Sequence, residues 1–211
     1  MRIIRRSDVD KLLTMKDAVR LARESFTQLS SGKAIVPPRA AIQIANGTGV
    51  SLFMPGYLED SGALAMKIVS VCDGNRELGL PLINAVVILT DAKTGMPLAA
   101  MDGGLITAVR TGASSGLATE LLSRSDSQTA AIFGAGVQAR TQLLAIAEVR
   151  PLKLAKVYSP TSTNAERLVD EIKDKLPGVE LQPAKSPEDA IRNADVICTA
   201  TTSAEPVFDG A

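Results

Sequence analysis

The stretch Thr129-Ala130-Ala131-Ile132-Phe133-Gly134-Ala135-Gly136-Val137-Gln138-Ala139 decides the fold. Its first five residues form an apolar run, as in a strand that is buried on both faces. The rest reads G-x-G-x-x-A, in which Gly134 allows a tight turn, Gly136 lets the backbone approach a pyrophosphate, and Ala139 permits close packing of a helix on the sheet. The stretch therefore predicts a strand, a phosphate-binding turn and the N-terminus of a helix.

The segments after this turn alternate between helix and strand. A glycine-rich turn alone also occurs without a ligand, but here an apolar strand precedes it and the alternation continues to residue 200. We therefore favour dinucleotide binding over a purely structural turn. The expected helices cover residues 138–149, 164–176 and 187–193, and the expected strands cover residues 155–158, 179–182 and 196–200.

The N-terminal half has a different pattern. Thr14 precedes an amphipathic helix that is expected to end at Gly32. From Arg39 to Cys72 the apolar residues recur with a period of two, which indicates antiparallel strands, and residues 84–90 and 97–101 are expected to form a further strand pair. Turns are expected between these strands at Asn46-Gly47, residues 59–62 and residues 91–95.

A helix is expected at residues 105–123, broken by Gly112 and Gly116. The polar gap at residues 123–127 separates it from the buried strand. We therefore predict an α/β protein: an α+β domain at residues 1–123, then a Rossmann dinucleotide-binding domain at residues 124–211.

The composition narrows the classes of function. Lys and Arg equal Asp and Glu at 23 each, so no overall field attracts nucleic acid or anionic lipid. The chain has no histidine, which excludes an imidazole base and a histidine-bound metal within this polypeptide. No apolar run reaches the roughly 20 residues of a membrane span, and the N-terminus lacks the apolar core of a signal peptide. We expect a cytoplasmic protein without a nucleic-acid, membrane or metal partner, whose two cysteines, Cys72 and Cys198, are buried free thiols.

The cofactor preference depends on the end of the second strand of the Rossmann domain. NAD-selective domains carry an acid there, roughly 20 residues past the turn, whereas this chain has Ser159. Ser159 and Thr161 offer hydroxyls and no carboxylate that would repel a 2′-phosphate, but no arginine is present to bind one. These residues are also typical of a turn that caps the next helix. We expect NAD(P)(H), with a weak preference for NADP(H).

Three basic residues are candidates for binding a carboxylate. Lys67 lies in an apolar strand, where desolvation would lower its pKa toward the range useful for proton transfer. Arg39 follows two prolines, and Arg110 lies in the glycine-containing helix. Arginine presents a fork that suits the carboxylate of an amino or imino acid. Each of the three, taken singly, is also typical of a surface or structural charge.

Ordered motifs extend over nearly the whole chain: Val36-Pro37-Pro38-Arg39, Phe53-Met54-Pro55-Gly56, Met66-Lys67-Ile68-Val69, Asn75-Arg76-Glu77-Leu78-Gly79-Leu80-Pro81, Met101-Asp102-Gly103, Thr107-Ala108-Val109-Arg110-Thr111-Gly112-Ala113 and Gly134-Ala135-Gly136-Val137-Gln138-Ala139. With these motifs the chain resembles the ornithine cyclodeaminase/mu-crystallin family. The resemblance implies a homodimer formed by residues 1–123, which also bind substrate, and a nicotinamide cofactor in the Rossmann domain.

The resemblance also implies roles for single residues. Lys67 would be the catalytic lysine, and Arg39, Lys67 and Arg110 would bind the substrate, a small amino or imino acid that carries a carboxylate. The predicted cofactor-binding residues are Arg110, Thr111, Gly134, Gly136, Val137, Gln138, Ala139, Ser159, Thr161 and Thr201.

The family's reactions share hydride exchange between nicotinamide and a carbon that bears nitrogen. The motifs at residues 72–81 and 110–113 are similar to those of the alanine dehydrogenase and ketimine reductase members. Two alternatives stay open: an ornithine cyclodeaminase that yields proline and ammonia, and a mu-crystallin-like protein that binds NADP(H) without important turnover.

A complete dinucleotide fold has two βαβαβ halves, and this chain contains the first. The family's catalytic aspartate is expected beyond residue 211. Residues 196–200 would then form a sheet edge with an apolar face, unless another segment covers it. Either residues 1–211 are a fragment or another segment covers this edge, and we expect residues 1–211 alone to show no turnover.

Overall fold

The structure, a computed structural model, describes residues 1–44 and 47–210. The chain divides into two compact units, one of Met1–Thr14 and Arg20–Thr107 and the other of Met15–Val19 and Ala108–Ala211. The units part within a helix at Thr107, whereas the domain boundary predicted from sequence follows residue 123; that boundary stays a prediction. Within the described ranges, no helix has the length and apolarity that crossing a membrane requires.

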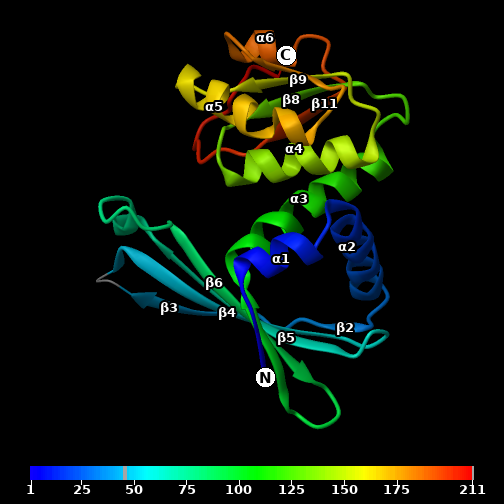
Figure 1. The fold of residues 1–211 in the computed structure, drawn as a ribbon, viewed down its shortest axis with the longest axis vertical. Coiled ribbons are helices and arrows are strands. Elements are labelled where there is room, and N and C mark those ends of the chain that lie inside the picture. The colour runs from blue at the N-terminus through cyan, green and yellow to red at the C-terminus, as the bar shows by residue number, and fades with distance from the viewer. Residues whose placement is uncertain (45–46, 211) are drawn as a thin grey trace. The chain divides into compact units, whose positions relative to one another are not determined.

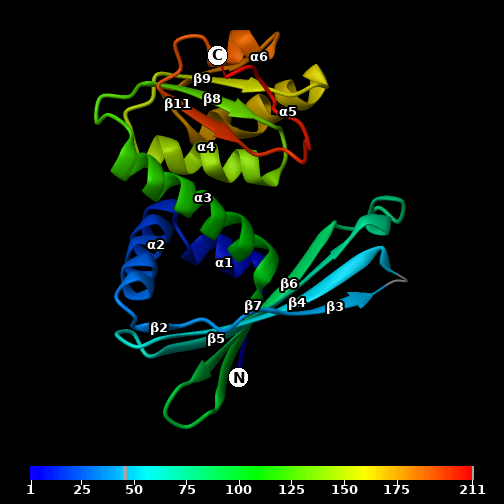
Figure 2. The ribbon, with the colours of Figure 1, turned by 180° about the vertical axis from the view of Figure 1, so that it is seen from behind.

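The first unit contains a twisted sheet whose core is antiparallel. The predicted strands are confirmed, and β4 pairs with β5, β5 with β6, and β6 with β7 in antiparallel register. β2 and β3 pair with opposite ends of the long strand β4, as Figure 2 shows. The elements are β1 (Arg2–Ile4), α1 (Arg6–Leu12), α2 (Met15–Ser30), β2 (Ala34–Ile35), β3 (Ala40–Ile44), β4 (Gly49–Leu58), β5 (Ala63–Cys72), β6 (Ile83–Asp91) and β7 (Pro97–Asp102).

The turns of this sheet follow the sequence prediction where they are described. Gly62 and Gly95 have φ of 62° and 73°, in the left-handed region that favours glycine. Asn46 lies outside the described residues, so the turn predicted at Asn46-Gly47 is described only from Gly47 on. The helix predicted after Thr14 is α2, which ends at Ser30, and Gly32 follows it with φ of 75°, as expected.

The second unit is a Rossmann-type half. Its four-stranded sheet has the order β10-β9-β8-β11, and every neighbouring pair is parallel. Figure 1 shows α4 and α5 together on one side of this sheet and α6 on the other. The elements are α3 (Gly103–Leu122), which begins in the first unit, and β8 (Thr129–Phe133), α4 (Val137–Val149), β9 (Leu154–Tyr158), α5 (Ser162–Ile172), β10 (Glu180–Pro183), α6 (Pro187–Ile191) and β11 (Val196–Thr199).

Each face of this sheet has its own apolar core. Ile132 of β8 and Val157 of β9 pack under α4 and α5, where Leu143 and Leu168 are fully buried. On the other face Phe133 lies 5.0 Å, between ring centroids, from Phe208 of the C-terminal segment. β11 is at the sheet edge, as the sequence predicted, and residues after it cover part of the sheet.

The prediction that α3 is broken at Gly112 and Gly116 is wrong, because the helix continues through both. A Cβ on Gly112 would lie 2.5 Å from the carbonyl oxygen of Thr141, and one on Gly116 would lie 3.0 Å from Ala145. The two contacts are one helical turn apart on both α3 and α4. The glycines therefore serve close packing of two helix backbones, a use that sequence alone does not distinguish from helix breaking.

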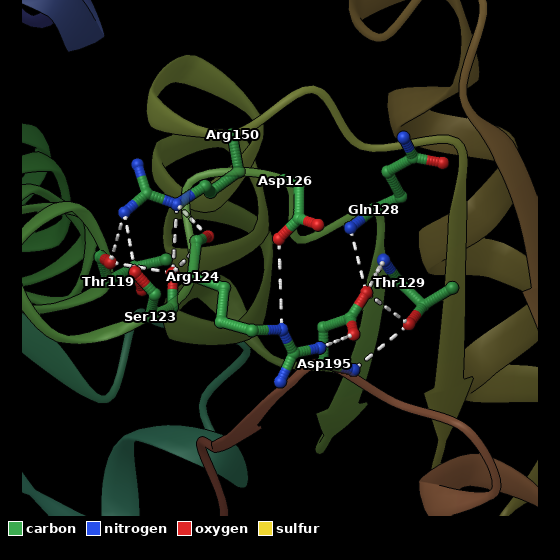
Figure 3. A network of polar contacts seen from close by, with 8 residues as sticks. All are labelled: Thr119, Ser123, Arg124, Asp126, Gln128, Thr129, Arg150 and Asp195. Atoms are coloured by element: carbon green, nitrogen blue, oxygen red, sulfur yellow. Dashed lines mark hydrogen bonds and ion pairs between the residues drawn. The ribbon is translucent and has the colours of Figure 1, made fainter.

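A polar network joins the end of α3 to the start of β8 (Figure 3). The guanidinium of Arg150 donates to the carbonyl oxygens of Thr119, Glu120 and Ser123, and so caps the C-terminus of α3. The carboxylate of Asp195, just before β11, accepts from the backbone N–H of Gln128 at 2.8 Å and of Thr129 at 3.0 Å and pairs with Arg124. Hydrogen bonds of these two amides hold the pKa of Asp195 below its usual value.

Both cysteines are free and partly buried. The Cys198 thiol donates to Oε1 of Gln142 at 2.7 Å, and this oxygen also accepts from Ser115 at 3.0 Å. Burial raises the pKa of Cys198 to about 11, so the thiol is protonated at neutral pH and serves packing between β11, α4 and α3.

Candidate dinucleotide-binding site

The turn between β8 and α4 requires glycine at its first position. Gly134 has φ of 104°, and a Cβ there would lie 2.3 Å from the carbonyl oxygen of Ala200. Its N–H donates to the carbonyl of Tyr158 at 2.8 Å. Any side chain would therefore strain the backbone and push away the segment after β11.

Gly136 has a different surrounding. It is the N-cap of α4, makes no side-chain capping bond, and a Cβ added to it would meet nothing within 4 Å. Val137, Gln138 and Ala139 form the first turn of α4, whose amides point out of the helix end. Ala139 is fully buried, as close packing of helix on sheet requires. The open space in front of an uncapped helix N-terminus fits an anionic group such as a pyrophosphate.

The order of the strands places this turn beside a topological switch point. β8 continues through α4 to β9 on one side, while β11 pairs on the other side, so the carboxyl ends of β8 and β11 flank the crevice in which ligands of such sheets bind. Thr201 follows β11, and its methyl group lies 3.5 Å from a Cβ built on Gly134. The structure thus brings Thr201 to the glycine turn.

Ser159 and Thr161 follow the next strand, β9, at the same edge of the sheet. Thr161 is the N-cap residue of α5, but its side chain makes no capping hydrogen bond. The alternative interpretation, that this threonine is there to cap the helix, has no bond to support it. A ligand role for both residues stays a prediction.

Arg110 and Thr111 lie on the part of α3 that belongs to the second unit. The next residue, Gly112, packs against Thr141, one turn into α4, so the pair lies near the helix end that carries the glycine turn. Arg110 is exposed as a residue, although partial burial lowers the pKa of its guanidinium. An arginine remains charged after such a shift, so Arg110 is available to an anion.

Lys67 and Arg39 belong to the sheet of the first unit. Lys67 is partly buried in the middle of β5, where it pairs with Met54 of β4 and Val87 of β6. Arg39 is exposed and directly precedes β3, whose first residue, Ala40, pairs with Phe53. If this register is continued by one residue, Arg39 lies beside Met54, which in turn pairs with Lys67. Arg39 and Lys67 are then separated by two strand spacings, about 10 Å. The roles of both residues stay predictions.

Sequence reasoning missed Arg140, which contacts the glycine turn. Its partners are Ala135, five residues earlier, and Glu171, 31 residues later, and no local pattern signals the second contact. A cavity of about 450 Å³ lies elsewhere, at the other end of α4 between Glu148, Leu152 and Leu176. Its place, away from the carboxyl ends of the strands, separates it from the candidate site.

A parallel sheet in the order 3-2-1-4 with a Gly-x-Gly-x-x-Ala turn after its first strand defines a protein with a Rossmann-type domain. Comparison with known proteins then gives the family. The chain belongs to the ornithine cyclodeaminase/mu-crystallin family, whose model matches residues 2–211.

Three relatives show how closely the chain is matched. It is 35% identical over 208 residues to Delta(1)-pyrroline-2-carboxylate reductase of Bacillus cereus, covering 99% of this chain and 64% of that protein. It is 47% identical to the Delta(1)-pyrroline-2-carboxylate reductase of Thermococcus litoralis, which was solved with NADH and L-proline. That match has a TM-score of 0.92 and covers 99% of this chain and 64% of the other. An archaeal alanine dehydrogenase dimer with bound NAD matches at 32% identity and a TM-score of 0.89, with coverages of 98% and 62%. The chain thus spans less than two thirds of the length of these relatives.

Proposed function

We propose that the protein is a nicotinamide-dependent reductase of a small imino acid, with Delta(1)-pyrroline-2-carboxylate as the first substrate to test. The observation that carries the proposal is the uncapped glycine turn at the switch point, in a chain that is 47% identical over 99% of its length to a reductase of that substrate. In this proposal residues 1–123 bind substrate and form the homodimer, and residues 124–211, together with Arg110 and Thr111, bind the dinucleotide.

The residues have distinct tasks in this proposal. Gly134, Gly136, Val137, Gln138 and Ala139 form the turn and helix end that hold the pyrophosphate. Ser159 and Thr161 bind the adenosine ribose, and Arg110, Thr111 and Thr201 complete the cofactor site. When bound, the nicotinamide supplies a hydride for the carbon of the substrate's C=N bond.

The substrate's charges set the task of the basic residues. Arg39 and Arg110 bind the carboxylate, because a guanidinium fork matches its two oxygens. Lys67 holds a proton for the imine nitrogen, which must gain one as the C=N bond becomes CH–NH. Reduction of the imine by one hydride and one proton then gives the cyclic amino acid.

The cofactor preference belongs to the same proposal. The two solved relatives cited above contain NADH and NAD, respectively. Residues 159–163, directly after β9, include no carboxylate, so we expect NADPH to be accepted as well and retain the weak preference for it. Titration of the chain with NADH and NADPH under identical conditions shows which cofactor binds more tightly. A much larger Kd for NADPH would contradict this preference.

A steady-state assay of the whole protein tests the reaction. We expect saturable oxidation of NADH or NADPH with Delta(1)-pyrroline-2-carboxylate and formation of proline. Lys67→Met should abolish turnover and leave dinucleotide binding intact, whereas Lys93→Met, in the exposed turn before β7, should change neither. Ammonia release from ornithine without net cofactor oxidation, or dinucleotide binding with no turnover on any imino acid, would contradict the proposal.

A further inference from the structure

The side chain of Arg140 joins the glycine turn to a neighbouring helix. Arg140 lies in the first turn of α4, and its Nη1 donates to the carbonyl oxygen of Ala135 at 2.7 Å. Its Nε donates to Oε2 of Glu171 on α5 at 2.6 Å. The side chain of Arg140 is 21% exposed. The guanidinium is therefore engaged on two sides by the protein itself.

The bond to Ala135 constrains the peptide that carries the Gly136 N–H. No peptide bond is cis among the described residues, and in a trans peptide the C=O and the following N–H point in opposite directions. Holding the Ala135 carbonyl toward Arg140 therefore turns the Gly136 N–H the other way. The Cα of Gly136 faces open space, where a built Cβ meets nothing within 4 Å.

We propose that Arg140, held by Glu171, is a positioning residue that fixes the Ala135–Gly136 peptide so that the Gly136 N–H donates to the cofactor pyrophosphate. It acts through this peptide and does not itself bind the cofactor. The inference rests on the dinucleotide binding proposed above. It adds two residues, outside the G-x-G-x-x-A pattern, that determine how well the turn recognises a phosphate.

Glu171 distinguishes positioning from a simple charge effect. If Arg140 acted on the pyrophosphate as a distant positive charge, removal of the Glu171 carboxylate would strengthen binding, because the positive potential at the turn would rise. If Arg140 acts by holding the peptide, loss of Glu171 releases its side chain and weakens binding. The two mechanisms predict opposite signs for one substitution.

Calorimetric titration of the chain with adenosine, ADP-ribose and NADH tests the proposal. We expect Arg140→Met to raise the Kd of ADP-ribose and NADH about tenfold, as for loss of one hydrogen bond to an ionised group, and to leave adenosine, which has no phosphate, unchanged. Glu171→Ala should raise the same two constants by a smaller factor. Arg167→Met is the matched control: this exposed arginine lies 3.9 Å from the same carboxylate and donates to the side chain of Asn164 on its own helix, α5.

The outcomes separate the proposals. Unchanged ADP-ribose binding in Arg140→Met, equal losses for adenosine and ADP-ribose, or tighter ADP-ribose binding in Glu171→Ala would each overturn the role of Arg140. Failure of the unsubstituted chain to bind ADP-ribose or NADH would instead overturn the proposed function. If Arg140→Met does not fold, Glu171→Ala still shows whether ADP-ribose binds more weakly or more tightly, and so distinguishes the two mechanisms.

Discussion

At the scale of single residues, the two glycines of the turn are under different constraints. A Cβ on Gly134 would clash with a backbone oxygen at 2.3 Å, whereas one on Gly136 would enter open space. The first glycine is required by the protein fold. The second leaves room that the fold does not use, and this difference supports a ligand at Gly136.

Alanine at each position should therefore have separate effects. Gly134→Ala should lower Tm by several degrees, because its φ of 104° and the contact with Ala200 disfavour any side chain. Gly136→Ala should leave Tm within about 2 °C of the parent and raise the Kd for NADH about tenfold, because the methyl group would occupy the space of the pyrophosphate. Thermal melts and NADH titrations check both; unimpaired NADH binding by Gly136→Ala would place the pyrophosphate elsewhere.

A second residue-scale prediction concerns Asp195 and pH. Hydrogen bonds in the fold lower the pKa of this carboxyl, so its contribution to stability is fully present above the unfolded pKa, near 3.8, and is lost as pH falls through the folded pKa. Asp195→Asn should lower Tm at neutral pH by roughly 2–4 °C, since about 1 kcal/mol corresponds to such a shift in a chain of this size. The difference from the parent should shrink as the pH falls below 4.

Arg124→Met is the control for this prediction. The pKa of Asp195 is lowered first by the Gln128 and Thr129 hydrogen bonds and only last by the charge of Arg124, whose side chain is 69% exposed. Arg124→Met should therefore lower Tm less than Asp195→Asn does. A larger Tm loss in Arg124→Met than in Asp195→Asn at pH 7 would show that the ion pair dominates.

At the scale of elements, the packing of α3 on α4 depends on Gly112. Gly112→Ala should separate the helices and destabilise the protein by about 1–3 kcal/mol, as overpacking does, because its Cβ would lie 2.5 Å from the Thr141 carbonyl. Gly104→Ala, near the start of the same helix, is the matched control. Its Cβ would meet its nearest neighbour at 3.6 Å, an ordinary van der Waals contact at the second residue of the helix, so stability should stay within about 0.5 kcal/mol of the parent. Chemical denaturation measures both; equal stabilities of the two variants would contradict the close contact.

Elements whose pattern is local could be predicted from the sequence, and those that depend on distant partners could not. The buried strand β8 shows its continuous apolar run, and the amphipathic helix α2 its period, within a short stretch of chain. β1 has three residues and forms through pairing of Arg2–Ile4 with Ala99–Met101, nearly a hundred residues away, so no local signal indicated it. The same holds for Gly112, whose purpose is visible only once Thr141 lies against it.

The residues of the candidate site also differ in whether the sequence alone predicts them. The G-x-G-x-x-A turn is contiguous in sequence, so its glycines were recognised with their roles. The Arg140–Glu171 pair joins two helices and cannot be recognised from the sequence, because nothing in either helix alone specifies the partner. Lys67 and Arg39 stand out in the sequence as basic residues in unusual places, and only the register of β3, β4 and β5 shows that they align across the sheet, two strands apart.

At the scale of the whole molecule, the first unit leaves apolar surface uncovered near β2 and β3. Ile35, Val36 and Ile42 are between 53% and 60% exposed, and β3 pairs with β4 on one side only. Exposed apolar residues along a sheet edge favour association, and two copies of one chain commonly associate about a twofold axis. An archaeal alanine dehydrogenase related to this chain was solved as a dimer.

The proposed homodimer therefore predicts a sedimentation-equilibrium mass of twice 22.1 kDa at micromolar concentration. Ile42→Asp should shift the equilibrium toward the monomer, because dimerisation would then bury an unpaired carboxylate at the β3 edge. Leu122→Asp, at a leucine of the second unit that is 86% exposed, should leave the mass unchanged. A monomeric parent chain would contradict the dimer. A dimer that persists in Ile42→Asp and dissociates in Leu122→Asp would move the interface from the edge of β3 to the end of α3.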